Sequence, residues 1–215
     1  MTLRIEQYES IAYGPALDRQ MVLHGQRVAD LIPDTVMLLE HDPPVFTLGR
    51  QGNTAHLLVG EEQRRQRGIE LYHIDRGGDI TFHGPGQLVA YFIVAVGAGK
   101  HTKDLIWRCE QCLMDTAAAF GVIARRDPRY PGLWVGERKV GAVGLRIESG
   151  VTRHGIALNI NTDLSFFRLI NPCGITDYGV TSLAQETGAP LSMARSREAM
   201  AAAVEAHFGG GDRRR

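Results

Sequence analysis

The spacing of apolar and polar residues along the chain switches between two periods, and these periods predict its strands and helices. Residues 3–8 alternate as in a half-buried strand, whereas residues 15–31 follow a helical period. The apolar positions of that helix include Leu17, Met21, Val28 and Leu31. Residues 35–39 form a short apolar run, which is typical of a buried strand.

The rest of the chain continues in the same mixed manner. Strands are predicted at residues 71–74, 88–96, 133–135, 140–147 and 152–160, and helices at residues 103–120 and 192–208. Turns of a meander are expected at Gly136-Glu137 and Ser149-Gly150. Because strands and helices do not alternate regularly, we expect an α+β fold with a mixed or antiparallel sheet and flanking helices. Residues 1–208 would form one domain, followed by a flexible tail at residues 209–215.

The composition narrows the function classes. The 215 residues suffice for one domain with its own core, and a formal net charge of zero gives no reason to expect attraction to nucleic acid or to an anionic membrane. The chain begins without an apolar run of the signal-peptide type, and its most apolar stretch, residues 89–96, is far shorter than a membrane span. Three cysteines without a framework spacing indicate a reducing compartment, so we expect a cytoplasmic protein.

The most glycine-dense motif reads Arg76-Gly77-Gly78-Asp79-Ile80-Thr81-Phe82-His83 and continues as Gly84-Pro85-Gly86-Gln87. Its glycines permit positive φ angles and let a ligand approach the backbone closely, while Arg76 and His83 supply hydrogen-bond donors. A glycine-rich hairpin without a ligand is the alternative interpretation. A nucleic-acid-binding segment is disfavoured, because the motif occurs once and has no basic surround.

Lys139 is one of only three lysines in the chain, and arginine supplies every other basic residue. If its strand alternates regularly, Lys139 lies on an apolar face, which would partly desolvate the ammonium and lower its pKa. The other residues of that face are Gly141, Val143, Leu145 and Ile147. A lysine in this state acts as a base near neutral pH, which an arginine does not. The alternative is a solvated lysine at the end of a hairpin.

Cys173 lies between Pro172 and Gly174, in a predicted turn. A cysteine is more often a small buried hydrophobe than a nucleophile. Placement in a turn exposes the sulfur, however, and a nearby Lys139 ammonium would stabilise the thiolate. The pair therefore predicts a site for thiol-based acyl transfer.

Two other groups have simpler interpretations. Cys109 and Cys112 form a C-x-x-C pair, but the pair falls within a predicted helix and has no second pair to complete a metal site, so we expect both to pack in the core. His154-Gly155 lies within the predicted strand at residues 152–160. The histidine is either a satisfied core residue or part of a site, and a glycine inside a strand often marks close approach by a ligand or by backbone.

Together these motifs resemble one family over nearly the whole chain, the octanoyltransferases of lipoate biosynthesis (lipoyl/octanoyl-acyl carrier protein:protein transferases). Residues 41–50 resemble the family's first characteristic loop, and residues 76–87 resemble its substrate-binding signature. The resemblance implies that Cys173 and Lys139 are catalytic. The substrate-binding residues that it implies are Arg76, Gly77, Gly78, Asp79, Ile80, Thr81, Phe82, His83, Ala142, Val143, Gly144, Gly155, Ile156 and Ala157. The implied fold is that of the biotin/lipoate protein ligase catalytic domain.

The resemblance also implies a reaction and its partners. The octanoyl donor would be octanoyl-acyl carrier protein, and the acceptors would be the lipoyl domains of 2-oxoacid dehydrogenase complexes and the glycine cleavage H protein. The acyl group would pass through a thioester on Cys173 with Lys139 as general base. No cofactor and no metal is implied, and we expect a monomer that binds neither nucleic acid nor membrane.

Two other functions stay open at this point. One is an ATP-dependent ligase of the lipoate or biotin type, which activates a free acid and needs no cysteine nucleophile. The other is a non-catalytic protein that binds carrier domains. The combination of Cys173 with Lys139 favours the transferase over both alternatives.

Overall fold

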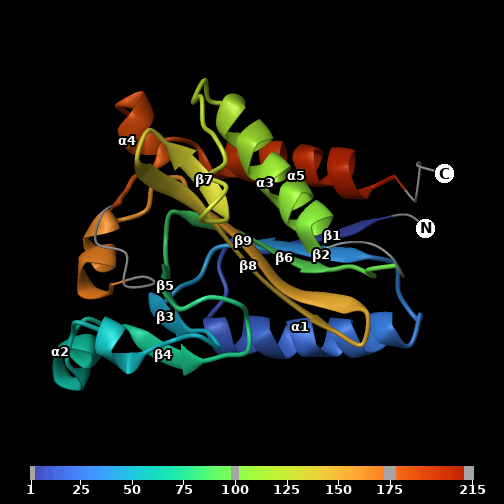
Figure 1. Ribbon diagram of the computed structural model, residues 1–215, viewed down its shortest axis with the longest axis horizontal. Helices are drawn as coiled ribbons and strands as arrows, with labels where there is room; N and C mark the ends of the chain where they lie inside the picture. Colours follow the sequence, from blue (N-terminus) through green and yellow to red (C-terminus); the bar gives the residue numbers. More distant parts are fainter. Residues whose placement is uncertain (1–2, 98–101, 172–177, 211–215) are drawn as a thin grey trace.

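The computed structural model describes residues 3–97, 102–171 and 178–210 of the chain. A large sheet lies between two helical layers, and a small sheet lies at one end (Figure 1). The strands of the large sheet are, in spatial order, β1 (Arg4–Gln7), β2 (Thr35–Leu39), β6 (Gln87–Ile93), β9 (Val151–Asn159), β8 (Arg138–Glu148) and β10 (Gly179–Val180), with β7 (Gly132–Val135) also paired to β8. The small sheet consists of β4 (Glu70–His73), β3 (Val45–Leu48) and β5 (Ile80–His83).

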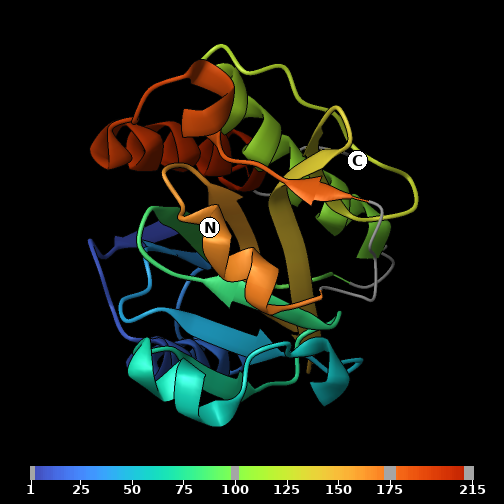
Figure 2. The ribbon, with the colours of Figure 1, turned by 90° about the vertical axis from the view of Figure 1, so that its left-hand side faces the viewer.

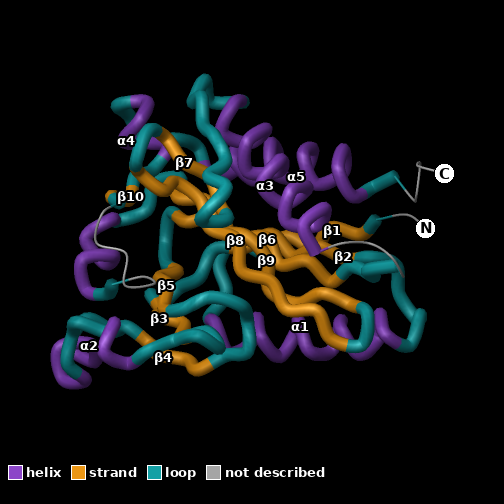
Figure 3. Tube along the Cα trace, viewed as in Figure 1, coloured by secondary structure: helices purple, strands orange, loops and turns teal. Residues whose placement is uncertain are grey.

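Both sheets combine parallel and antiparallel pairs. Figure 3 shows the strands in orange and the helices in purple. In the large sheet β1 runs parallel to β2 and β10 runs parallel to β8, while the other pairs are antiparallel. The predicted α+β fold with a mixed sheet is therefore confirmed. The predicted turn between β8 and β9 is also confirmed, because Ser149 and Gly150 have φ angles of 49° and 73°, the left-handed values of a two-residue hairpin turn.

Helices cover both faces of the large sheet. The helix α1 (Tyr13–Val28) lies on one face, and α3 (Thr102–Ala118) with α5 (Met193–Phe208) lies on the other (Figure 2). Cys109 and Cys112 are fully buried in the cluster between α3, α5 and the sheet, as predicted. In the described ranges we find no helix whose length and apolar content would let it cross a membrane.

The predicted first helix is present as α1, but two of its apolar positions, Met21 and Val28, do not lie on its buried face. Met21 and Val28 are 48% and 44% exposed, and Leu31 lies beyond the end of α1. The buried face instead carries Tyr13, Ala16, Gln20, Leu23 and His24. Polar side chains are tolerated there because they find partners on β8 and β9: Gln20 accepts a hydrogen bond from the His154 backbone, and His24 bonds the Glu148 carbonyl. A search for apolar periodicity cannot recognise such a face.

Several short elements have no clear signal in the sequence. They are β3, β5, α2 (Glu61–Gln66), α4 (Leu183–Thr187) and the 3-10 helices η1 (Thr54–His56) and η2 (Leu164–Leu169). The helix α2 buries none of its residues, so its sequence lacks an apolar stripe. The strand β5 lies inside the glycine-dense motif, where flanking glycines weaken any strand pattern. Both sheets border the cavity described below, so these short elements matter for the site.

Candidate active site

One cavity of about 850 Å³ lies between the small sheet and the β8–β9 hairpin. Its lining includes Lys139 and every described residue that the sequence predicts as substrate-binding except Phe82. Phe82 is 1% exposed and packs in a separate cluster, with its ring stacked on Phe166 at 4.7 Å between centroids. The fold thus gathers the glycine-dense motif and the two strands β8 and β9 around one pocket.

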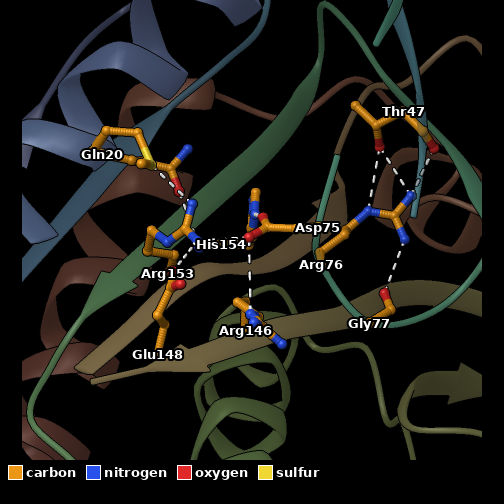
Figure 4. Close-up of polar contacts among 10 residues, drawn as sticks. Gln20, Thr47, Asp75, Arg76, Gly77, Arg146, Glu148, Arg153 and His154 are labelled. Carbon is orange, nitrogen blue, oxygen red and sulfur yellow. Dashed lines mark hydrogen bonds and ion pairs between the residues drawn. The ribbon is translucent and has the colours of Figure 1, made fainter. Parts of the chain in front are cut away.

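The loop of the glycine-dense motif is held by hydrogen bonds on both of its sides. Arg76 donates from Nη2 to the Thr47 carbonyl at 2.7 Å and to Thr47 Oγ1 at 2.9 Å (Figure 4). Gly77 donates its backbone N–H to the Leu145 carbonyl of β8 at 3.2 Å. Gly78 has a φ of 87°, which confirms the predicted positive angle in this motif. The loop is therefore fixed to both sheets at the cavity wall.

An ionic cluster fastens the residue that precedes this loop. Asp75 lies at the centre of the cluster, where it accepts hydrogen bonds from His154 Nε2 at 3.0 Å and from Arg153 Nη2 at 2.6 Å (Figure 4). Arg146 lies 3.8 Å from the same carboxylate, and Glu148 also binds Arg153. Burial alone would raise the pKa of Asp75, but the hydrogen bond from His154 and the charge of Arg153 outweigh burial and lower that pKa.

The structure distinguishes between the alternative interpretations of His154 and Gly155 on β9. His154 is 2% exposed, lines the cavity and has a φ of 60°, a strained value for a histidine inside a strand. Burial lowers the pKa of its imidazole, although Asp75 opposes the shift, so the neutral ring donates from Nε2. Gly155 marks close approach by backbone, since a Cβ there would lie 1.9 Å from the Ala90 carbonyl oxygen. His154 is thus a satisfied residue that also borders the site.

Lys139 is half-buried at the start of β8, and its side chain lies beside the Trp134 ring. A Cβ at Gly132 would lie 2.7 Å from Lys139 Cε, so this glycine makes room for the lysine stem. The ammonium lies 5.4 Å from the centre of the Trp134 ring. The apolar face predicted for Lys139 does not continue to Gly141, because a Cβ on Gly141 would point at Leu113 of α3, on the core side of the sheet. Lys139 is therefore not a solvated hairpin lysine.

An aromatic wall that includes Trp134 is a feature that the sequence analysis missed. Trp134 and Tyr178 pack edge to face at 5.1 Å between ring centroids, and Tyr130 contacts Tyr178 at 5.6 Å. Trp134 donates its indole N–H to the Tyr130 carbonyl at 3.1 Å. The three rings come from the loop before β7, from β7 itself and from the residue before β10. Only their pairing in space joins them, so no local signal could have revealed the wall.

His83 and His41 are buried side by side, and His83 lines the cavity. His83 Nδ1 is hydrogen-bonded to Gln87 Oε1 at 2.7 Å, and His41 Nε2 is hydrogen-bonded to the Tyr91 hydroxyl at 2.7 Å. Burial lowers the pKa of His83 to about 3 and that of His41 to about 4. Both rings are therefore neutral near pH 7. Tyr91 and Tyr13, which line the cavity beside them, were not among the predicted residues.

Cys173 and its neighbours Pro172 and Gly174 lie outside the described residues. The described residues on either side of this gap, Asn171 and Tyr178, both line the cavity. Asn171 donates its backbone N–H to the His56 carbonyl at 2.7 Å, and His56 in turn is hydrogen-bonded to the Asp79 carboxylate. The chain therefore enters and leaves the undescribed segment at the cavity wall.

Comparison with known proteins gives a consistent family. The model of the lipoyl protein ligase A/B catalytic domain matches residues 12–205. A curated relative from Rubrobacter xylanophilus, named octanoyltransferase, is 46% identical over 184 residues, which is 85% of this chain and 82% of that protein. The family model and this relative cover the motif at residues 76–83 and Lys139 within the matched region.

Solved structures show the same fold at low sequence identity. A lipoate-protein ligase A crystallised with ATP superposes with a TM-score of 0.75 and 15% identity, covering 97% of this chain and 86% of that chain. A biotin protein ligase from Aquifex aeolicus superposes with a TM-score of 0.55 and 13% identity, covering 97% of this chain and 69% of that one. The predicted likeness to the fold of biotin/lipoate protein ligases is confirmed.

Proposed function

The chain belongs to the lipoyl protein ligase A/B catalytic domain family, and we propose that it transfers an octanoyl group from octanoyl-acyl carrier protein to a lysine of lipoyl domains. The arrangement of one cavity carries this proposal. Lys139 lines it together with the glycine-dense loop and the apolar side chains of Val143 and Ile156. Transfer of a medium-length acyl chain requires a basic group, a stretch of backbone that the substrate can approach closely, and an apolar chamber for the chain.

In the proposed first step, the Cys173 thiol gives its proton to the Lys139 amine, and the thiolate attacks the donor's carbonyl carbon. The carrier thiolate leaves and regains a proton from the Lys139 ammonium. One thioester replaces another, so this exchange is close to neutral in free energy. The position of Asn171 and Tyr178 at the cavity supports a nucleophile in the segment between them.

In the proposed second step, the neutral amine of the acceptor lysine attacks the Cys173 thioester. Lys139 takes the proton that this nitrogen loses and returns it to the departing Cys173 thiolate. A thioester becomes an amide, which is downhill, so the reaction needs no nucleotide to drive it. The proposed acceptors are the lipoyl domains of 2-oxoacid dehydrogenase complexes and the glycine cleavage H protein.

The apolar chamber supports a preference for a medium acyl chain. Val143, Leu145 and Ile156 line it, and each methylene that leaves water there contributes about 0.8 kcal/mol. Eight carbons therefore provide enough binding energy for the depth of the chamber to discriminate chain length. The polar loop at residues 76–78 borders the same space and would lie near the carbonyl.

The second candidate is an ATP-dependent ligase, favoured by the fold of the ATP-bound lipoate-protein ligase A. One assay separates the two. The purified protein is incubated with a lipoyl domain and either octanoyl-acyl carrier protein in chelator without nucleotide, or free octanoate with ATP and magnesium. We expect octanoyl-lipoyl domain in the first mixture only. Product in the second mixture alone would assign the protein to the ligases.

A further inference from the structure

A chain of buried hydrogen bonds runs from the cavity to the strand of Lys139. His83 bonds Gln87 at 2.7 Å, and Gln87 donates from Nε2 to Asn159 Oδ1 at 2.9 Å. Asn159 donates from Nδ2 to the Thr181 carbonyl at 3.0 Å, and Thr181 donates its backbone N–H to the Lys139 carbonyl at 3.0 Å. Gln87 and Asn159 are opposite each other on β6 and β9, and both are buried.

The direction of this chain is fixed by two backbone carbonyls, which can only accept. Because Asn159 faces the Thr181 carbonyl, its amide nitrogen must point there and its oxygen must face Gln87. Gln87 Nε2 also donates to the Phe82 carbonyl at 3.2 Å. This second carbonyl independently fixes the orientation of the Gln87 amide, with its nitrogen toward Asn159. The Gln87 oxygen is therefore left for His83, whose Nδ1 must carry the proton and donate it.

This tautomer determines what His83 presents to the cavity. A neutral imidazole that donates from Nδ1 has an unprotonated Nε2, which is an acceptor only. His83 lines the cavity, and among the described residues no donor is hydrogen-bonded to its Nε2. The imidazole that borders the cavity at this wall therefore has an acceptor as its second ring nitrogen. An acyl chain and a thioester carbonyl offer no donor, so the group complementary to this acceptor is a donor elsewhere on a substrate, such as an N–H.

We propose that Gln87 and Asn159 are positioning residues, which hold His83 as the Nδ1–H tautomer for a substrate N–H and tie this wall to the backbone of Lys139. The N–H belongs either to an amide of the donor's thioester arm or to the acceptor amine. The functional part of this inference rests on the proposed function, whereas the tautomer is a property of the protein alone. Gln87 sets the tautomer, and Asn159 carries the link to β10.

The first test is nuclear magnetic resonance of the full chain labelled with ¹⁵N-histidine, with His83 assigned by the loss of its signals in His83→Asn. Long-range ¹H–¹⁵N spectra separate the two tautomers. We expect Nδ1–H for His83 in the native protein and a shift toward Nε2–H in Gln87→Met, which keeps length but removes the acceptor. An Nε2–H tautomer in the native protein would overturn the proposal, and this holds even if Gln87→Met fails to fold.

The second test separates the two residues. In Asn159→Leu the Phe82 carbonyl still orients Gln87, so the tautomer should stay Nδ1–H while kcat for transfer falls by at least about tenfold, because the Lys139 strand loses its anchor. Asn161→Leu is the matched control, since the Asn161 side chain likewise makes two hydrogen bonds, both with the Leu191 backbone and neither within the Gln87–Asn159 network. An equal loss of kcat in both variants would refute a positioning role.

Kinetics of the two half-reactions identify the N–H donor. A Gln87→Met variant that mainly slows acylation by octanoyl-acyl carrier protein assigns the N–H to the donor arm, and one that mainly slows transfer from the acyl-enzyme assigns it to the acceptor amine. An effect on neither half-reaction would overturn the functional role. If the native protein transfers no octanoyl group while His83 is Nδ1–H, the proposed function fails and the tautomer assignment remains.

Discussion

Two polar networks border the same cavity, and they differ in charge and in exposure. The cluster at Asp75 is ionic, and the Asp75 side chain is 42% exposed although Arg153 is only 5% exposed. The chain through Gln87 and Asn159 is neutral, and both residues are buried. The first network fastens the glycine-dense loop, and the second fastens His83 and the strand beside Lys139.

We interpret this difference as a separation of substrate binding from chemistry. A partly exposed ion cluster weakens with salt and with protonation, so it suits a loop that receives and releases a substrate. A buried neutral network keeps its donors and acceptors in one direction at any pH near neutrality, so it suits the wall where the proposed proton transfers would take place. Each of the following predictions tests whether one side of the cavity serves chemistry and the other serves binding.

The largest effect is expected on the chemical side. Lys139→Arg keeps a positive charge beside Trp134 but removes a base, so the transfer rate should fall at least about a hundredfold. Steady-state transfer to a lipoyl domain measures the loss. Lys103→Arg, at an exposed position of α3, is the control and should keep the native rate. Near-native activity in Lys139→Arg would mean that Lys139 contributes only charge or packing and is not a base.

On the binding side, Gly78→Val should slow acylation by about tenfold or more. Its φ of 87° strains any side chain, and a valine would project into space at the cavity wall. Cys173 should still react with a small alkylating reagent, which separates a blocked pocket from a lost thiol. Gly188→Val is the matched control, since Gly188 has a φ of 78° at the end of α4. Equal acylation rates in the two variants would remove Gly78 from the substrate wall.

Acid should unfold the protein through the buried histidines. The pKa values of His83 and His41 are lowered to about 3 and about 4, so only the unfolded chain takes up their protons as the pH falls below about 6.5. The free energy of unfolding should then drop by about 1.4 kcal/mol per pH unit for each histidine, or about tenfold in the equilibrium constant. Urea titrations from pH 7 to 5 measure this slope. An unchanged slope in His83→Gln would contradict a buried neutral His83.

The smallest effect is expected at the ionic cluster. Asp75→Asn should raise KM for octanoyl-acyl carrier protein by about fivefold with little change in kcat, since a partly exposed ion pair contributes at most about 1 kcal/mol. Asp115→Asn is a close control, because Asp115 is also 42% exposed and pairs with His207 at 2.6 Å. A loss confined to kcat would place Asp75 on the chemical side instead.

The folded pKa of Asp75 gives a second expectation with a definite sign. Because it is lowered, the carboxylate stabilises the native state above the ordinary aspartate pKa, and that contribution is lost as the pH falls through the folded value. Asp75→Asn should therefore flatten the acid limb of the stability curve below about pH 4. An acid limb identical to that of the native protein would show that Asp75 titrates normally.

Local patterns were sufficient to predict the β8–β9 hairpin, its turn and the glycine-dense loop. Alternation, a Ser-Gly turn and a run of glycines act within a few residues, so they can be recognised without the fold. The buried face of α1 could not be predicted in this way, because Gln20 and His24 are paired with strands more than a hundred residues away. A polar residue is tolerated in a core only when its partner is known.

The same limit applies to the site. Lys139 and the loop residues stand out by residue type and by resemblance, but the contact of Lys139 with Trp134 depends on how β7 pairs with β8. The chain through Gln87 and Asn159 joins residues 72 positions apart, and its direction follows from backbone carbonyls that exist only in the folded sheet. Composition and spacing carry no information on either contact.

The central claim is a covalent acyl-enzyme on Cys173, and mass spectrometry of the intact protein after incubation with octanoyl-acyl carrier protein tests it most directly. We predict one octanoyl adduct without nucleotide, mapped by peptide analysis to Cys173 and absent in Cys173→Ala. Cys109 and Cys112 should stay unmodified, because burial raises the pKa of both thiols. An adduct at Cys109 or Cys112, or full transfer activity in Cys173→Ala, would contradict the account.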